Sequence, residues 1–213
     1  MRMPFIATLT VFLLLPLTCL AVPTGLNMMP TAESLGMAET RVEVESAGGG
    51  KMYVPRGDTL YGSQVGALLG VEAGIDQVSG PGTRYNAKWV FKGDGLILPA
   101  LAVGVQNVSS NTKSDVYAVA TKSLVPGGLV KLHAGVMRSE GEDYTMLGAS
   151  FRLGPIQVKA DQINGGLSGN LHQGQSYSAG ASVGNITLTG THYDYETGSD
   201  KNTVTVSYSY KPL

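Results

Sequence analysis

The sequence predicts an all-β protein, an antiparallel up-and-down transmembrane β-barrel of about twelve strands. Segments of about ten residues alternate apolar and polar side chains, which is the period of a β-strand. The stretch RYNAKWVFKGDGLILPALAVGVQN (84–107) shows this pattern twice, on either side of a KGDG turn. The chain is also rich in glycine, with 29 in 213 residues. Beyond the N-terminal leader, no segment has convincing helical periodicity.

The N-terminus reads as a secretory signal peptide. The segment 1–21 (MRMPFIATLTVFLLLPLTCLA) has a basic Arg2, an apolar run and a small residue, Ala21, at the expected cleavage site. The apolar run is short for a membrane helix and is bounded by prolines. We therefore expect three parts: the signal peptide (1–21), an N-terminal arm (22–38) and a barrel domain (39–213). The single cysteine, Cys19, is lost with the leader, so no disulfide is expected within the mature chain.

The spacing of turn residues divides the barrel domain into strands. The expected strands are 39–47, 51–56, 62–77, 83–92, 96–108, 115–123, 129–138, 144–153, 156–163, 175–184, 186–195 and 202–211. Their connections alternate between tight turns and longer polar loops, as in outer-membrane barrels with short periplasmic turns and an even number of strands. If both termini are periplasmic, 62–77 runs outward and one hairpin must precede it. The segment 51–56 is counted for this reason, although Pro55 removes a ladder donor. Ten strands is the fallback.

The two faces of these strands differ in charge, and this favours a membrane barrel. One face is apolar and almost uncharged. The other carries most of the ionic groups, which in a membrane barrel line the lumen. The candidate lumen residues are Glu43, Glu72, Asp76, Arg84, Asn86, Lys88, Gln106, Lys131, His133, Arg152, Lys159 and Asp161. A secreted soluble β-sandwich, with the apolar face inward, is the alternative.

Aromatic residues gather near the ends of the expected strands, as interfacial girdles do. Tyr85, Tyr117 and Tyr177 are expected on the loop side, and Phe91, Phe151, Tyr208 and Tyr210 on the turn side.

A short motif in the arm resembles a known family. The segment GLNMMPTAESL (25–35) supplies Gly25, Leu26, Met29, Pro30, Thr31 and Ala32, and the run EAGID…YNAKW…PALAVGVQN (72–107) follows it. Together they are similar to the exopolysaccharide-associated outer-membrane barrels of the YjbH type. The resemblance implies an outer-membrane barrel with a link to polysaccharide export. The C-terminal SYSYKPL departs from the final aromatic residue that is usual in such barrels.

The sequence argues against several kinds of chemistry. His133, Asp161 and the many serines could form a Ser/His/Asp set, but no nucleophile-elbow pattern singles out a serine. We therefore expect a non-enzyme, and keep a lipid-modifying barrel enzyme as an alternative. No close group of His, Asp and Glu predicts a metal, and no cofactor is expected. No basic patch or tail predicts nucleic-acid binding.

The expected function follows from the fold. The sequence predicts a bacterial outer-membrane barrel that acts as a narrow passive pore or an envelope-structural protein, and the resemblance to the YjbH-type barrels implies a further link to polysaccharide export. Its expected partners are membrane lipid and small polar solutes or polysaccharide. A barrel of twelve strands is wider than barrels filled by side chains and narrower than open porins. The number of strands therefore does not decide between an open and a plugged lumen. The other alternative is an interaction module that uses the external loops at 108–115 and 164–175.

Overall fold

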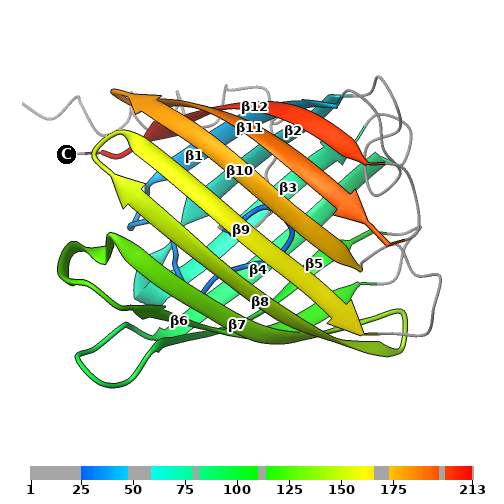
Figure 1. The fold of residues 1–213 in the computed structure, drawn as a ribbon, viewed down its shortest axis with the longest axis horizontal. Helices are drawn as coiled ribbons and strands as arrows, with labels where there is room; N and C mark the ends of the chain where they lie inside the picture. Colours follow the sequence, from blue (N-terminus) through cyan, green and yellow to red (C-terminus); the bar gives the residue numbers. More distant parts are fainter. Residues whose placement is uncertain are drawn as a thin grey trace, which may run out of the picture.

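The described residues form a closed antiparallel barrel, as the sequence predicts. The computed structural model describes residues 25–47, 59–78, 82–109, 114–165, 173–196 and 200–212. Within these ranges each of twelve strands pairs with its neighbours in the chain, and β1 closes the sheet against β12 (Figure 1). Closure matters because an unpaired backbone N–H or C=O in hydrocarbon costs several kcal/mol.

The strands are β1 (Thr40–Ala47), β2 (Thr59–Gly66), β3 (Val71–Val78), β4 (Gly82–Lys92), β5 (Ala100–Val108), β6 (Asp115–Ser123), β7 (Val130–Ser139), β8 (Glu142–Leu153), β9 (Ile156–Gly165), β10 (Gly174–Val183), β11 (Ile186–Tyr195) and β12 (Lys201–Tyr210). Two short 3₁₀ turns, Leu68–Gly70 and Pro126–Gly128, lie in the connections. In the part of the chain that the structure describes, no helix is long and apolar enough to cross a membrane.

The first hairpin differs from the sequence prediction. The single strand expected at 62–77 is two strands, β2 and β3, joined by the turn Leu68–Gly70. Leu69 (φ 61°) and Gly70 (φ 76°) both adopt left-handed backbone there. The sequence does not mark this turn, because Leu68 and Leu69 are apolar like many residues of the strands on either side. The strand expected at 51–56 lies outside the described residues. The described residues nevertheless form twelve strands, the expected number, because the segment expected as one strand forms two.

The connection after β4 is also longer than the predicted KGDG turn (92–95). Strand β5 begins at Ala100 instead of residue 96, and Leu96 and Ile97 are almost fully exposed. Lys122 holds this turn by donating a 2.9 Å hydrogen bond to Asp94 Oδ1. Hydrogen bonds from Lys122 and Ser123 lower the pKa of Asp94 to about 2. The other nine predicted strands agree with the observed ones to within two residues.

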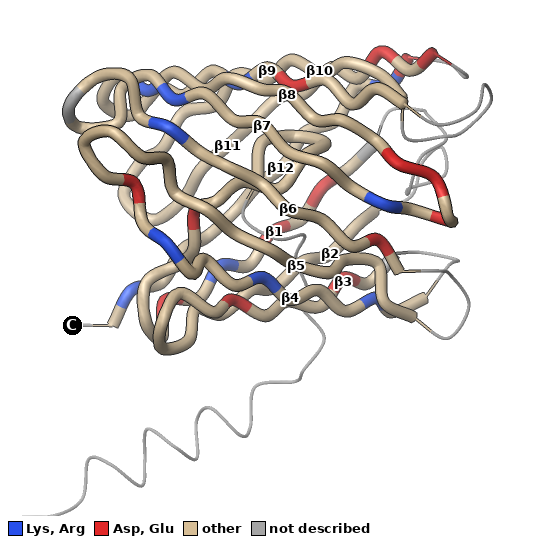
Figure 2. The backbone as a smooth tube through the Cα atoms, turned by 90° about the horizontal axis from the view of Figure 1, so that it is seen from below, with Lys and Arg blue, Asp and Glu red and all other residues tan. Residues whose placement is uncertain are grey.

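Apolar side chains cover the outside of the barrel. Large outward-facing residues include Tyr85, Trp89, Phe91, Leu147, Phe151, Tyr177, Tyr208 and Tyr210, each more than two fifths exposed. Charges are few on the last three strands: β10 carries none, and β11 and β12 carry one each (Figure 2). An apolar exterior on a closed barrel is the arrangement that membrane-spanning strands require.

Tyr117 is an exception to the predicted aromatic girdle. Its side chain points into the barrel and is only 5% exposed. Gly104 on the neighbouring strand makes this possible, because a Cβ there would lie 2.3 Å from the Tyr117 hydroxyl. Tyr117 is part of an apolar cluster that fills one side of the interior. Besides Tyr117, its wall residues are Ala100, Ala102, Val119, Met137, Tyr144, Met146 and Ile163.

Candidate functional site

The N-terminal arm runs through the interior of the barrel. Within the described part of the predicted arm, residues 25–38, the side chains of Met29, Thr31, Ala32 and Leu35 are at most 4% exposed. Met29 and Ala32 pack against the apolar cluster on the wall. The arm therefore acts as an internal plug, and the candidate site is the lumen that it divides.

Asp161 on β9 binds the first part of the arm. Its Oδ2 accepts hydrogen bonds from the backbone amides of Asn27 (3.1 Å), Met28 (2.7 Å) and Met29 (2.9 Å). Three consecutive N–H groups around one carboxylate form a compact anion-binding nest. Hydrogen bonds to an ionised acceptor are about twice as strong as neutral ones. Asp161 is 4% exposed, so this cluster is shielded from bulk water.

Side-chain contacts extend this attachment to the neighbouring strands. Asn27 donates to Ser176 Oγ (3.0 Å), and Ser178 donates to Asn27 Oδ1 (2.6 Å). Lys159 donates to the Gly25 carbonyl (3.3 Å). The start of the described arm is thus held by β9 and β10 together.

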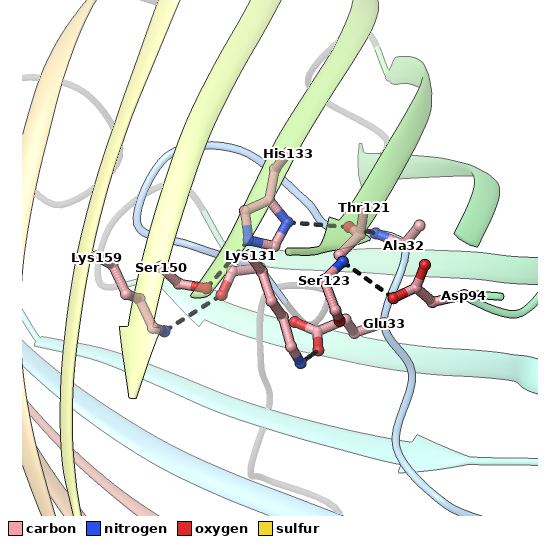
Figure 3. A network of polar contacts seen from close by, with 10 residues as sticks. Ala32, Glu33, Asp94, Thr121, Ser123, Lys131, His133, Ser150 and Lys159 are labelled. Atoms are coloured by element: carbon pink, nitrogen blue, oxygen red, sulfur yellow. Dashed lines mark hydrogen bonds and ion pairs between the residues drawn. The ribbon is translucent and has the colours of Figure 1, made fainter. Parts of the chain in front are cut away.

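The middle of the arm meets a hydrogen-bonded row on β6, β7 and β8 (Figure 3). The Ala32 amide donates to Thr121 Oγ1 (2.9 Å), and Thr121 Oγ1 lies 2.9 Å from His133 Nδ1. His133 Nε2 in turn lies 3.2 Å from Ser150 Oγ. Beside this row, Lys131 forms an ion pair with Glu33 of the arm.

The His133 row resembles a serine–histidine pair but has a different third member. A catalytic triad uses a buried carboxylate to orient the imidazole and to stabilise its protonated form. Here a threonine hydroxyl occupies that place, and it also accepts the Ala32 amide. The arrangement therefore fits a structural connection between wall and arm better than an activated nucleophile.

The end of the arm rests on β2 and β3. The Leu35 amide donates to Glu72 Oε2 (3.0 Å), and Glu72 forms a fully buried ion pair with Lys88 (3.5 Å). The Ala38 amide donates to the Gly66 carbonyl (2.8 Å). Gly66 must lack a side chain, because a Cβ there would lie 2.1 Å from the Gly36 carbonyl oxygen.

A polar cavity of about 350 Å³ remains between the arm and the wall. It is lined by four basic residues (Arg41, Lys131, Arg152, Lys159) and four acidic residues (Glu33, Glu39, Glu43, Glu45). Six serine and threonine residues of β11 and β12 also line it, together with Tyr193. The lining extends from Gly128 and Gln157, at the end of the barrel with the short turns, to Glu45 and Tyr193, two residues from the opposite ends of β1 and β11.

The twelve predicted lumen residues fall into two groups. Glu43, Lys131, Arg152 and Lys159 line the cavity, with Arg152 largely exposed. The other eight are buried: Glu72, Asp76, Arg84, Asn86, Lys88, Gln106, His133 and Asp161. Four of the twelve contact the arm directly, namely Glu72, Lys131, Lys159 and Asp161.

Another four of the predicted residues, Asp76, Arg84, Asn86 and Gln106, belong to a network at the end with the longer loops. Asn86 donates to Asp76 Oδ2 (2.6 Å) and accepts the Asn107 amide (2.9 Å). Asn107 and Gln106 both donate to Asp115 Oδ2, at 2.6 and 3.3 Å. This network joins β3, β4, β5 and β6.

Sequence reasoning missed the residues that complete the site. Asp115 was not among the candidates, and neither were the serines and threonines of β10, β11 and β12. Their alternation with apolar residues was the signal that could have found them, because it places Ser176, Ser178 and Thr191 on the inner face. Among the described residues, no three His, Cys, Asp or Glu side chains are arranged to hold a metal ion.

Comparison with known proteins identifies the architecture. No protein-family model matches the chain, and no curated protein matches it. Among solved structures, the chain is similar to "KdgM porin in complex with disordered oligogalacturonate". The TM-score is 0.58 at 10% identity, over 81% of this chain and 99% of that one. A second structure, "KdgM porin", matches with the same TM-score at 11% identity. A mutant of the Rh. blastica porin matches with a TM-score of 0.46 at 10% identity, over 72% of this chain and 55% of that one. At these identities the likeness to the two KdgM structures establishes the fold, which is that of a porin-like transmembrane barrel.

Proposed function

We propose that the protein is a bacterial outer-membrane channel of narrow bore for small polar solutes, with the N-terminal arm as its internal plug. The observation that carries the proposal is the polar cavity beside the arm. A barrel with a purely structural role needs no such cavity, because side chains alone can fill a small barrel. In this chain the apolar cluster fills one side of the lumen, and the other side keeps a cavity lined by ionic and hydroxyl groups.

The link to polysaccharide export is part of the same proposal. The arm motif that resembles the YjbH-type barrels is the segment that lies inside the lumen. The similar KdgM structure was determined with an oligogalacturonate, so a barrel of this size and shape can hold a saccharide chain. We therefore propose small saccharides as the solutes. A catalytic role is not proposed, because Thr121 stands where an orienting carboxylate would be needed.

Single-channel recording in planar bilayers tests this function. The full-length protein is expected to give small, long-lived conductance steps. Deleting residues 25–38 should raise the step size several-fold, because the plug then no longer fills the lumen. If neither form gives channel events, the proposed function is wrong. Circular dichroism and heat-modifiable gel mobility, measured on both forms, show whether the barrel is folded in each sample.

The location is tested separately by fractionation. We expect the mature protein in the outer-membrane fraction, extracted by detergent and not by high salt. Recovery in a freely soluble fraction would contradict the proposal.

A further inference from the structure

One wall of the cavity is built from hydroxyl groups. We call it the hydroxyl face, and its residues are Thr187, Thr189, Thr191, Thr205, Ser207 and Ser209. They occupy alternate positions of β11 and β12, so all six point to the same side of the sheet. Thr189 pairs directly with Thr205, and Thr187 with Ser207. The hydroxyls therefore form a continuous surface over two neighbouring strands.

Most of these hydroxyls are available to a ligand. Thr187 is hydrogen-bonded to Ser182 (2.8 Å), and Thr205 donates to Glu45 (3.3 Å). Within the described ranges, the hydroxyls of Thr189, Thr191, Ser207 and Ser209 make no hydrogen bond to another side chain. Each hydroxyl can donate one hydrogen bond and accept two. A ligand that is itself rich in hydroxyls matches both capacities.

The charges around the cavity are balanced, and both signs occur on the same wall. Lys131, Arg152 and Lys159 come from β7, β8 and β9, and the fourth basic residue, Arg41, shares β1 with Glu43 and Glu45. With four groups of each sign in the lining, an ionic ligand gains no net attraction from the cavity as a whole. The same ionic groups can hydrogen-bond to the hydroxyls of an uncharged ligand.

We propose that this cavity is a binding site for a neutral mono- or disaccharide, in preference to an acidic sugar. This deepens the proposed function, because it assigns a substrate class to the same lumen. A volume of about 350 Å³ is at the lower end of the range of small-molecule pockets, about 300 to 1,000 Å³, which limits the ligand to one or two sugar rings. The acidic oligogalacturonate of the similar KdgM structure is thus not the class that this cavity favours.

Calorimetric titration of the full-length, detergent-solubilised protein with glucose, maltose and digalacturonate tests the proposal. Maltose is expected to bind saturably and more tightly than digalacturonate. The double variant Thr189→Val, Ser207→Ala should weaken maltose binding about tenfold, because it removes two neutral hydrogen bonds without adding charge. Ser63→Ala, on the outer face of β2, is the matched control and should leave the affinity unchanged. Absence of saturable maltose binding, or equal affinity in the double variant, overturns the proposal.

Charge variants test the selectivity independently of the hydroxyls. Glu43→Gln leaves an excess of positive charge in the lining and should raise the affinity for digalacturonate about threefold or more. Arg152→Gln should lower it. If the unmodified protein already binds digalacturonate more tightly than maltose, the assignment to neutral sugars is wrong.

The binding experiment and the conductance experiment can fail separately, because sugar binding in detergent needs no conduction. Binding without channel events therefore contradicts the pore alone, and conduction without maltose binding contradicts the site alone.

Discussion

Asp161 on β9 and Met29 on the arm are joined inside the barrel by a hydrogen bond of 2.9 Å, in which the Met29 amide donates to the carboxylate. The two residues are 132 positions apart in the sequence. The same oxygen accepts the amides of Asn27 and Met28. One carboxylate therefore holds the first part of the described arm, and its removal should have effects on both stability and conductance.

Replacing Asp161 with alanine should loosen the arm without opening the barrel. Hydrogen bonds to charged groups are worth about 1.5 to 3 kcal/mol, so we expect the free energy of unfolding to fall by about that amount. Urea unfolding in detergent measures this change. Asp143→Ala is the control, because Asp143 is paired with Arg138 on the exposed surface and should contribute less than about 1 kcal/mol. Channel conductance should rise in Asp161→Ala and not in Asp143→Ala. An unchanged conductance would show that the arm is not the restriction.

Gly66→Ala should displace the end of the arm. The added methyl group would lie 2.1 Å from the Gly36 carbonyl oxygen and 2.6 Å from that of Leu35, so one of the two backbones must move. Cleavage after Glu33 by a glutamate-specific protease measures the exposure of the arm. We expect slow cleavage in the unmodified protein and at least tenfold faster cleavage in Gly66→Ala. Gly93→Ala, where a Cβ meets no atom within 4 Å, should behave like the unmodified protein. Equally fast cleavage in all three would place the arm outside the lumen, and equally slow cleavage would show that Gly66→Ala does not displace it.

The barrel could be predicted from the sequence because the charged residues follow the two-residue period of the strands and so mark one face of the sheet. Along β4, Arg84, Asn86 and Lys88 alternate with Tyr85, Ala87 and Trp89, and only one assignment of faces puts ions away from lipid. Strand β6 lacks this contrast. Its inner Tyr117 and Val119 are as apolar as its outer Val116 and Ala118, so alternation alone could not assign Tyr117 to the interior.

The plug could not be predicted from the same pattern. The arm has no strand period, and its main attachments join its backbone amides to side chains of distant strands, such as Thr121 and Glu72. A backbone amide has the same donor chemistry in every residue except proline, so the sequence of the arm does not mark these contacts. The sequence therefore predicts the candidate lumen residues but not the arm, which four of them contact.

Lys88→Met should be strongly destabilising. Lys88 and Glu72 form an ion pair in which both side chains are at most 2% exposed, and breaking a buried pair from one side costs about 3 to 5 kcal/mol. The double variant Lys88→Met, Glu72→Gln should recover part of this loss, because no buried charge then remains without its ion-pair partner. Arg138→Met tests an exposed pair, Arg138–Asp143, and should change the free energy of unfolding by less than about 1 kcal/mol. Similar losses in Lys88→Met and Arg138→Met would mean that the inner wall is open to bulk water.

Trp89 reports directly on which face of the barrel meets lipid. It is the single tryptophan in the chain, and its side chain is 51% exposed on the outer face of β4. In lipid vesicles its fluorescence should be blue-shifted and quenched by brominated acyl chains, while aqueous iodide should quench it weakly. Moving the tryptophan to an inward position, with Trp89→Phe combined with Ala102→Trp, should abolish quenching by brominated lipid if the variant folds. Folding is checked by heat-modifiable gel mobility. The outward-facing control is Trp89→Phe combined with Val103→Trp, because Val103 lies beside Ala102 on β5 and faces outward. Strong iodide quenching of Trp89, or equal lipid quenching at positions 102 and 103, would contradict an apolar exterior facing the bilayer.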